Sequence, residues 1–199
     1  MKTKIGCVVM AAGGATRFGK NKLLSPLDGV TLAQRAIDAV PAEKLHRAVV
    51  VTGYPEIAAL AQSRGLAVVV NGRPEDGASR TVRLGVEALE ASCDAILFLV
   101  SDQPLLTRQT VADLIDFYHA HPGHIVAAAH NGVRGNPCLF PRDYFNALKS
   151  LTGDTGGSAV IRRHEENLLL MEVSAPQLED VDTPQALAAL QQQLHTAQE

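Results

Sequence analysis

The N-terminal stretch joins an apolar run to a glycine-rich, basic loop: Ile5-Gly6-Cys7-Val8-Val9-Met10-Ala11-Ala12-Gly13-Gly14-Ala15-Thr16-Arg17-Phe18-Gly19-Lys20-Asn21-Lys22. The run is apolar without alternation, which is typical of a parallel strand that is buried on both faces. Glycines let backbone amides turn toward an anion, and Arg17, Lys20 and Lys22 add three positive charges. The stretch therefore predicts a phosphate site. A glycine-rich turn with exposed basic residues stays open as the simpler interpretation.

This loop comes close to two standard phosphate-binding patterns and matches neither. The dinucleotide pattern G-x-G-x-x-G is absent, because Gly13 and Gly14 are adjacent and no third glycine has the required offset. The mononucleotide pattern G-x-x-x-x-G-K-[ST] fits Gly14, Gly19 and Lys20. It fails at Asn21, because an amide replaces the Mg²⁺-binding hydroxyl poorly.

The rest of the chain alternates short apolar runs with amphipathic segments. The apolar runs predict strands over residues 5–10, 48–52, 66–70, 95–100, 125–129 and 168–173. Helices are predicted after Thr31, over 56–63, 79–91, 144–148 and 158–163, after Thr107 and from Pro184, with a possible hairpin at 131–137. This order implies right-handed crossovers and a doubly wound, mostly parallel sheet. No linker divides the chain, so we expect one domain over residues 1–199.

Composition and charge exclude several classes of protein. Lys and Arg number 18 against 21 Asp and Glu, a net charge of −3, so no basic field attracts nucleic acid. Cys7, Cys93 and Cys138 lie far apart without zinc spacing, which predicts reduced thiols and no disulfide framework. We see no signal peptide and no run of membrane-spanning length. We therefore expect a cytoplasmic protein with no nucleic-acid or membrane partner.

Two carboxylates stand where an α/β sheet binds ligands. Asp102 directly follows the apolar run 95–100, and ligands bind beyond the carboxyl ends of such strands. A carboxylate there needs a cation, and Mg²⁺ bound to nucleotide phosphates is the natural one. Asp182 is a second candidate ligand. Two simpler interpretations stay open: Asp102 forms a turn with Pro104, and Asp182 or Thr183 caps the last helix.

Four histidines gather in one segment, His119, His121, His124 and His130. No carboxylate or cysteine stands at ligand spacing beside them, so we expect a solvated helix end and no metal site. The chain also has no Ser-His-Asp order and no G-x-S-x-G elbow, which argues against a hydrolase nucleophile.

Motifs recur in a fixed order along nearly the whole chain. The first is A-A-G, three residues, R-[MF]-G, two residues and K-L-L, present as Ala11-Ala12-Gly13, Arg17-Phe18-Gly19 and Lys22-Leu23-Leu24. The others are Val51-Thr52-Gly53-Tyr54, Asp102-Gln103-Pro104, Gly135-Asn136-Pro137, Gly153-Asp154 with Gly156, and Asp180-Val181-Asp182-Thr183-Pro184. Together they resemble the molybdenum cofactor nucleotidyltransferases, specifically the cytidylyltransferase branch, within the nucleotide-diphospho-sugar transferase-like superfamily.

The resemblance implies a fold and a reaction. The fold is a three-layer αβα sandwich, and the reaction is Mg²⁺-dependent transfer of CMP from CTP to molybdopterin cofactor with release of pyrophosphate. The guanylyl branch usually has A-G-G where this chain has Ala11-Ala12-Gly13, so Ala12 favours CTP over GTP. A molybdoenzyme or its chaperone is implied as the receiving partner. Arg80 departs from the family, which often has consecutive serines there.

The resemblance also implies roles for individual residues. Catalysis is expected from Arg17, Lys22 and Asp102, and Mg²⁺ binding from Asp102 and Asp182. Nucleotide binding is expected from Ala11, Ala12, Gly13, Gly14, Arg17, Lys22, Gly77, Ser79 and Thr81. Acceptor binding is expected from Gly135, Asn136, Pro137, Gly153 and Asp154.

Three rival functions stay open at this point. Another nucleotidyltransferase of the same fold would use GTP, or a sugar or polyol phosphate acceptor. A phosphate-loop kinase or NTPase is opposed by Asn21. A non-catalytic molybdenum cofactor carrier would not need Asp102 or Lys22, so their presence counts against it.

Overall fold

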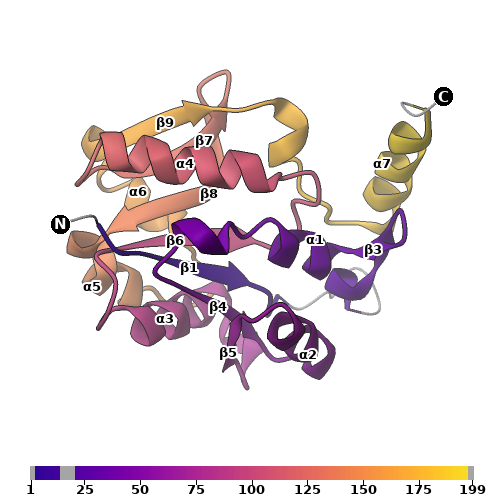
Figure 1. The fold of residues 1–199 in the computed structure, drawn as a ribbon, viewed down its shortest axis with the longest axis horizontal. Coiled ribbons are helices and arrows are strands. Elements are labelled where there is room, and N and C mark those ends of the chain that lie inside the picture. Colours follow the sequence, from indigo (N-terminus) through magenta and orange to yellow (C-terminus); the bar gives the residue numbers. More distant parts are fainter. Residues whose placement is uncertain (1–2, 14–20, 197–199) are drawn as a thin grey trace.

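A computed structural model of the protein describes residues 3–13 and 21–196. Its centre is a seven-stranded sheet with the order β5-β4-β1-β6-β8-β7-β9 (Figure 1). The strands are β1 (Ile5–Met10), β4 (Arg47–Thr52), β5 (Ala67–Val70), β6 (Ala95–Val100), β7 (Ile125–His130), β8 (Val133–Pro141) and β9 (Leu168–Glu172). Only β8 runs against the others. The predicted doubly wound, mostly parallel sheet is confirmed.

Helices cover both faces of this sheet and complete the three layers. One face carries α1 (Leu32–Asp38), α2 (Pro55–Ser63) and α4 (Arg108–Ala120), and the other carries α3 (Ala78–Leu89), α5 (Phe145–Lys149) and α6 (Ser158–Ile161). Short 3₁₀ turns are η1 (Lys22–Leu24), η2 (Ala42–Lys44), η3 (Pro74–Asp76), η4 (Arg142–Tyr144), η5 (Glu165–Asn167) and η6 (Ala175–Leu178).

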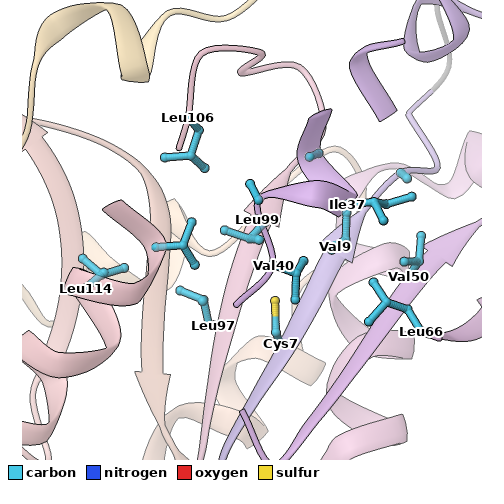
Figure 2. Close-up of a cluster of buried hydrophobic side chains, with 14 of the residues drawn as sticks. Cys7, Val9, Ile37, Val40, Val50, Leu66, Leu97, Leu99, Leu106 and Leu114 are labelled. Atoms are coloured by element: carbon cyan, nitrogen blue, oxygen red, sulfur yellow. The ribbon is translucent and has the colours of Figure 1, made fainter. Parts of the chain in front are cut away.

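The two apolar layers explain why β1 lacks alternation. Figure 2 shows Cys7 and Val9 in the layer that also contains Ile37 of α1 and Leu114 of α4. Val8, between them in sequence, belongs to the layer on the opposite face. Each face of the strand is therefore buried, and every position is apolar.

A third, smaller apolar cluster holds the C-terminal segment against the sheet edge. It contains Leu27 of β2 (Pro26–Leu27), Leu32, Val181, and Leu190 of α7 (Pro184–Thr196), and β2 pairs with β3 (Val30–Thr31). Figure 1 shows α7 beside β3 at one end of the molecule. This cluster fixes the segment around Val181 next to the end of β6.

The sequence located most elements within a few residues, with two differences. The 131–137 hairpin forms, and its turn is Asn131-Gly132, both with positive φ. The segment Gly135-Asn136-Pro137, expected before a strand, instead lies inside the long strand β8, with a cis bond before the proline. The small β2–β3 pair was not predicted. In the described part of the chain, no helix is long and apolar enough to span a membrane.

Candidate active site

The carboxyl ends of β1 and β6 form the centre of the site. These strands are parallel neighbours, so the residues after Met10 and after Val100 emerge at the same sheet edge. Ser101 Oγ donates to Met10 O at 3.0 Å and ties the two ends together. The Ala11 N–H donates to Val51 O at 2.9 Å, which extends the tie to β4. The edge is therefore rigidly braced where ligands bind in such sheets.

A pocket of about 200 Å³ opens at this edge. Its walls come from the first loop, the segment before α3, the end of β6 and the loop at 153–154. The lining residues are Met10, Ala12, Gly13, Lys22, Leu23, Pro74, Gly77, Ala78, Thr81, Val100, Ser101, Asp102 and Asp154. Six of the residues predicted to bind nucleotide or metal thus share one pocket, which we call the first pocket: Ala12, Gly13, Lys22, Gly77, Thr81 and Asp102.

Lys22 links the first loop to both predicted metal ligands. Its Nζ donates to Asp102 Oδ2 at 2.9 Å, to Asp182 Oδ1 at 2.9 Å and to the Val181 carbonyl at 3.2 Å. The three protons of the ammonium thus have three acceptors. Asn21 caps the 3₁₀ turn that carries Lys22, because its side chain accepts from the Leu23 N–H at 3.0 Å. Asn21 therefore has a structural task where a kinase-type loop has a hydroxyl.

The surroundings keep Lys22 charged. Burial acts to lower the pKa of its ammonium, but the charge of Asp102 and hydrogen bonds to Asp182 and Asp102 outweigh it and raise that pKa above its ordinary 10.5. The Lys22 side chain is 12% exposed, against 27% for Asp102 and 60% for Asp182. A fixed positive charge therefore stands between the two carboxylates at neutral pH.

The segment Asp180-Val181-Asp182 is anchored through its middle residue. Val181 is buried in the third cluster, and its N–H donates to the Asp102 carbonyl at 2.8 Å. The cap of α7 comes from Thr183, whose Oγ1 accepts from the Ala186 N–H at 3.1 Å. Thr183 is thus the capping residue among the two alternatives, and the Asp182 carboxylate pairs with Lys22.

Asp102 and the next residue, Gln103, open onto different cavities. Gln103 is buried, and its Nε2 donates to the Leu178 carbonyl at 3.2 Å. Both Gln103 and Asp180 line a second cavity of about 490 Å³. Partial burial and then the charge of Asp102 raise the pKa of the Asp180 carboxyl, because both disfavour its ionised form. The end of β6 therefore separates two cavities.

We call the second cavity the second cleft. It is lined by Gln103, His130, Asn131, Val133, Arg134, Gly135, Asn136, Ser158, Ala175, Leu178 and Asp180. Two residues predicted to bind the acceptor, Gly135 and Asn136, lie here, and Pro137 is buried next to them in β8. No sequence motif assigned a function to Arg134, Ser158 or Leu178. Tertiary packing brings these residues of β8, α6 and η6 to one cavity.

Gly153 and Asp154, also predicted to bind the acceptor, lie at the first pocket. The Gly153 carbonyl accepts from the Ser79 N–H at 3.3 Å, and Asp154 Oδ1 accepts from the Ala78 N–H at 3.3 Å. Gly77 has φ 87°, and a Cβ there would overlap the Gly153 carbonyl and lie 2.7 Å from the Asp154 nitrogen. The two loops pack backbone to backbone, so this wall of the pocket requires a glycine.

The remaining predicted residues have other placements. Ala11 and Ser79 are almost fully buried and do not line the first pocket. Arg80, whose role the sequence left open, donates to Asn71 Oδ1 at 3.0 Å and pairs with Asp76 at 3.5 Å. Arg80 thus holds the loop before α3 from outside the pocket. Gly14 and Arg17, predicted to bind nucleotide, lie outside the described residues, as does Lys20.

The donor set at the first pocket has the chemistry that Mg²⁺ prefers. Asp102 and Asp182 each present a carboxylate oxygen to the same point, where Lys22 Nζ now lies. Hard oxygen ligands, few in number and open to phosphate oxygens, fit magnesium. No cluster of three or more His, Cys, Asp or Glu suited to a metal occurs within residues 3–13 and 21–196. The histidines of 119–130 are among the residues that this statement covers.

Comparisons with known proteins agree with this geometry. The family described as "MobA-like NTP transferase domain" matches residues 7–168. The purine catabolism protein PucB of Bacillus subtilis is 27% identical over 191 residues, which cover 89% of this chain and 91% of PucB.

Solved structures share the fold. Rv0371c of Mycobacterium tuberculosis superimposes with a TM-score of 0.79 at 24% identity, over 96% of this chain and 99% of that one. A CMP:2-keto-3-deoxy-manno-octonic acid synthetase complexed with CTP has a TM-score of 0.75 at 15% identity, over 98% and 100%. At these identities the structures establish the fold alone. With the family match over most of its length, the chain belongs to the MobA-like NTP transferase domain family and is a nucleotidyltransferase.

Proposed function

We propose that this nucleotidyltransferase transfers CMP from CTP to molybdopterin cofactor and releases pyrophosphate. The main support for a transfer between two substrates is the presence of two cavities at the end of β6. Asp102 lines one of them and Gln103 lines the other. A nucleotide in the first pocket and an acceptor in the second cleft would meet at this strand end. The choice of acceptor rests on the sequence motifs that resemble the cytidylyltransferase branch.

Two residues in the first pocket favour cytosine. The methyl group of Ala12 occupies space that a glycine would leave for a larger base. Thr81 Oγ1 accepts from Asn71 Nδ2 at 3.1 Å, so its own proton is free to donate into the pocket. The pairing edge of cytosine offers two acceptors, O2 and N3, whereas that of guanine offers mainly donors. A hydroxyl donor in a small pocket therefore supports CTP.

The proposed reaction needs no general base. An ionised oxygen of the acceptor phosphate attacks the α-phosphorus of CTP, and the bond to the oxygen that bridges the β-phosphate breaks. Pyrophosphate leaves with that electron pair. The protein's contribution is alignment and charge neutralisation, for which the ammonium of Lys22 and the loop amides are suited. Asp102 and Asp182 would hold Mg²⁺, which supplies further neutralisation of phosphate charge when bound.

Pyrophosphate release tests the proposal. The enzyme is incubated with Mg²⁺ and molybdopterin cofactor, and CTP, GTP and ATP are compared. We expect release with CTP to exceed that with GTP by at least about fivefold, because a lost hydrogen bond or a steric overlap is worth about 1 kcal/mol or more. Release with GTP alone would assign the guanylyl reaction. Release with CTP only when a sugar or polyol phosphate replaces molybdopterin would assign a different acceptor, and tight cofactor binding without release would indicate a carrier.

The two pocket residues give a sharper version of this test. Thr81→Val removes the hydroxyl and keeps the shape, so we expect kcat/KM for CTP to fall about tenfold. Ala12→Gly enlarges the pocket, so the ratio of CTP to GTP activity should decrease. Arg83→Met in the same helix, whose side chain reaches the Leu151 carbonyl, is a control outside the pocket. Unchanged selectivity in both pocket variants would remove the argument for CTP from the geometry.

A further inference from the structure

Arg134 is the cationic side chain of the second cleft. It lies at the start of β8 and is half-buried, and its Nη1 donates to Ser158 Oγ at 3.0 Å. No ion pair joins it to a carboxylate in the described part of the chain. A guanidinium has five N–H donors and a permanent charge. The guanidinium also interacts with the Cys138 thiol, so both neighbours are neutral groups, and Arg134 keeps its remaining N–H donors and a charge that no carboxylate neutralises.

The transfer site beside this cleft is negatively charged. Asp102, Asp180 and Asp182 lie together at the end of β6, and Lys22 is the ammonium paired with two of them. Like charges at such separations repel, and partial burial strengthens the effect. An acceptor that carries a phosphate would thus meet repulsion on its way to Asp102. A cation within the second cleft would offset it.

The position of Arg134 in the fold suits this task. Strand β8 runs antiparallel to β6, so the first residues of β8 lie at the sheet edge where β6 ends. Gly135 allows the segment at Leu178 to pack closely, because a Cβ there would lie 3.1 Å from the Leu178 side chain. Arg134 and Gln103 consequently line the same cleft. The Ser158 hydroxyl accepts from Arg134 and keeps its own proton to donate.

We propose that Arg134, together with the Ser158 hydroxyl, binds the phosphate monoester of the acceptor in the second cleft. The planar guanidinium can donate two parallel hydrogen bonds to phosphate oxygens, and the hydroxyl adds a third donor. The subsite holds the nucleophile near the end of β6 and does not touch the nucleotide. The identity of the acceptor rests on the proposed function, whereas the anion subsite rests on the cleft itself.

Three variants test the subsite in the transfer reaction: Arg134→Met, Arg134→Lys and, as a matched control, Arg163→Met. Arg163 is exposed near the end of α6 and does not line the cleft. We expect Arg134→Met to raise KM for the acceptor roughly 10- to 100-fold, as loss of charged hydrogen bonds does. KM for CTP and the melting temperature should stay unchanged. Arg134→Lys should recover part of the lost acceptor affinity, because it restores the charge but not the two parallel N–H donors of the guanidinium.

Two outcomes in this assay would overturn the subsite. The first is an acceptor KM that is unchanged in Arg134→Met. The second is an equal rise in KM for CTP and for acceptor, which would show that Arg134 acts through the fold. The melting temperature and the Lys variant separate that structural effect from lost binding.

A binding experiment separates failure of the subsite from failure of the proposed function. If no nucleotide is transferred to molybdopterin, the acceptor is wrong, and inorganic phosphate becomes the probe. Phosphate binding is measured by calorimetry in the presence of saturating CTP, so that the first pocket is already occupied. Phosphate should bind wild type and Arg163→Met equally and Arg134→Met at least about tenfold more weakly. Equal affinity in all three proteins would contradict the subsite, whatever the acceptor is.

Discussion

The first pocket and the second cleft share one strand end but are built differently. The first pocket has walls of backbone: Ser101 ties β6 to β1, and the loop at Gly77 packs directly on Gly153. The second cleft is lined largely by side chains from the β7–β8 turn, η6 and α6. It is also larger, about 490 Å³ against about 200 Å³. Under the proposed function, a pocket set by backbone suits the nucleotide, and a cleft set by side chains suits the acceptor.

The first pocket and the second cleft also differ in how their cationic side chains are paired. In the first pocket the cation is already paired, because Lys22 contacts Asp102 and Asp182. In the second cleft Arg134 has a hydroxyl partner and no ion pair among the described residues. Under the proposed function, ligand binding in the first pocket would replace the ion pairs of Lys22 with contacts to phosphate. The second cleft instead offers the charge of Arg134, which no carboxylate neutralises.

The largest expected effect comes from Asp102, which faces the first pocket. Asp102→Asn keeps the shape and removes the charge that would hold Mg²⁺, so we expect turnover to fall about 10³-fold. Circular dichroism and the melting temperature should show an intact fold. Asp180→Asn is the comparison variant, because Asp180 lies near Asp102 but lines the second cleft. Its effect should stay below about tenfold. Near wild-type turnover of Asp102→Asn would exclude a metal role, and equal losses in both variants would remove the distinction between the cavities.

The next largest effect is expected from Lys22, and a comparison with Lys20 shows which of the two lysines acts in catalysis. Lys22→Met removes the ammonium that contacts both carboxylates, and we expect kcat/KM to fall about 10²-fold. Lys20→Met should cost less, because the motif that this sequence resembles has its lysine at the place of Lys22. Steady-state kinetics with CTP measures both. A larger loss at Lys20 would favour the kinase-type alignment of the loop.

The sequence predicted the first pocket better than the second cleft, and the reason is physical. Each wall of the first pocket follows a strand, and turn residues with fixed chemistry, such as Gly13 and Asp102, mark those places in the sequence. The family resemblance implied nucleotide binding for Lys22, Gly77 and Thr81, and all three line that pocket. The ion pair between Lys22 and Asp182 joins residues 160 positions apart, so no local pattern could have shown it.

The second cleft could be predicted only in part. Gly135 and Asn136 were proposed from a motif, but Arg134 and Ser158 are brought together by tertiary packing across 24 positions. Gly153 and Asp154 were expected at the acceptor, yet they lie at the first pocket because Gly77 packs on them. Spacing identifies residues at strand ends, whereas assigning a loop to one of two adjacent cavities depends on which backbone it contacts.

A substitution with a smaller expected effect tests whether the contact between Gly77 and Gly153 determines the shape of the first pocket. Gly77→Ala would force a Cβ onto the Gly153 carbonyl at a positive φ, so we expect a loss of about 2–3 kcal/mol in unfolding free energy. KM for CTP should rise while acceptor binding changes less. Gly72→Ala is the control, because a Cβ there has no neighbour within 4 Å. Urea unfolding compares them, and equal stability of both variants would show that this wall tolerates movement.

The smallest effect concerns a thiol beneath the second cleft. Cys138 is buried, and its Sγ donates to the Gly135 carbonyl at 3.3 Å. Burial raises the pKa of Cys138 from 9.0 to about 11, although the charge of Arg134 acts in the opposite direction. The folded protein therefore holds this proton more tightly than the unfolded chain. Its contribution to stability is fully present below pH 9 and is lost as the pH rises from 9 toward 11.

The raised pKa of Cys138 should make the unfolding free energy depend measurably on pH. Between pH 9 and 10, the unfolding free energy of wild type should fall by up to about 1.4 kcal/mol more than that of Cys138→Ala. Urea titrations at several pH values measure how the unfolding free energy changes with pH. These slopes are compared in place of absolute stabilities, because the substitution also changes packing.

Cys7 of β1 is a second buried thiol whose pKa is raised by burial. The unfolding free energy of wild type should therefore also fall more steeply with pH than that of Cys7→Ala. Arg134→Met should extend the loss of stability to higher pH, because the guanidinium no longer lowers the pKa of the Cys138 thiol in the folded protein. Identical slopes in wild type and Cys138→Ala would show that the thiol beneath the cleft reaches water, and the cleft floor would then be less closely packed than its geometry indicates.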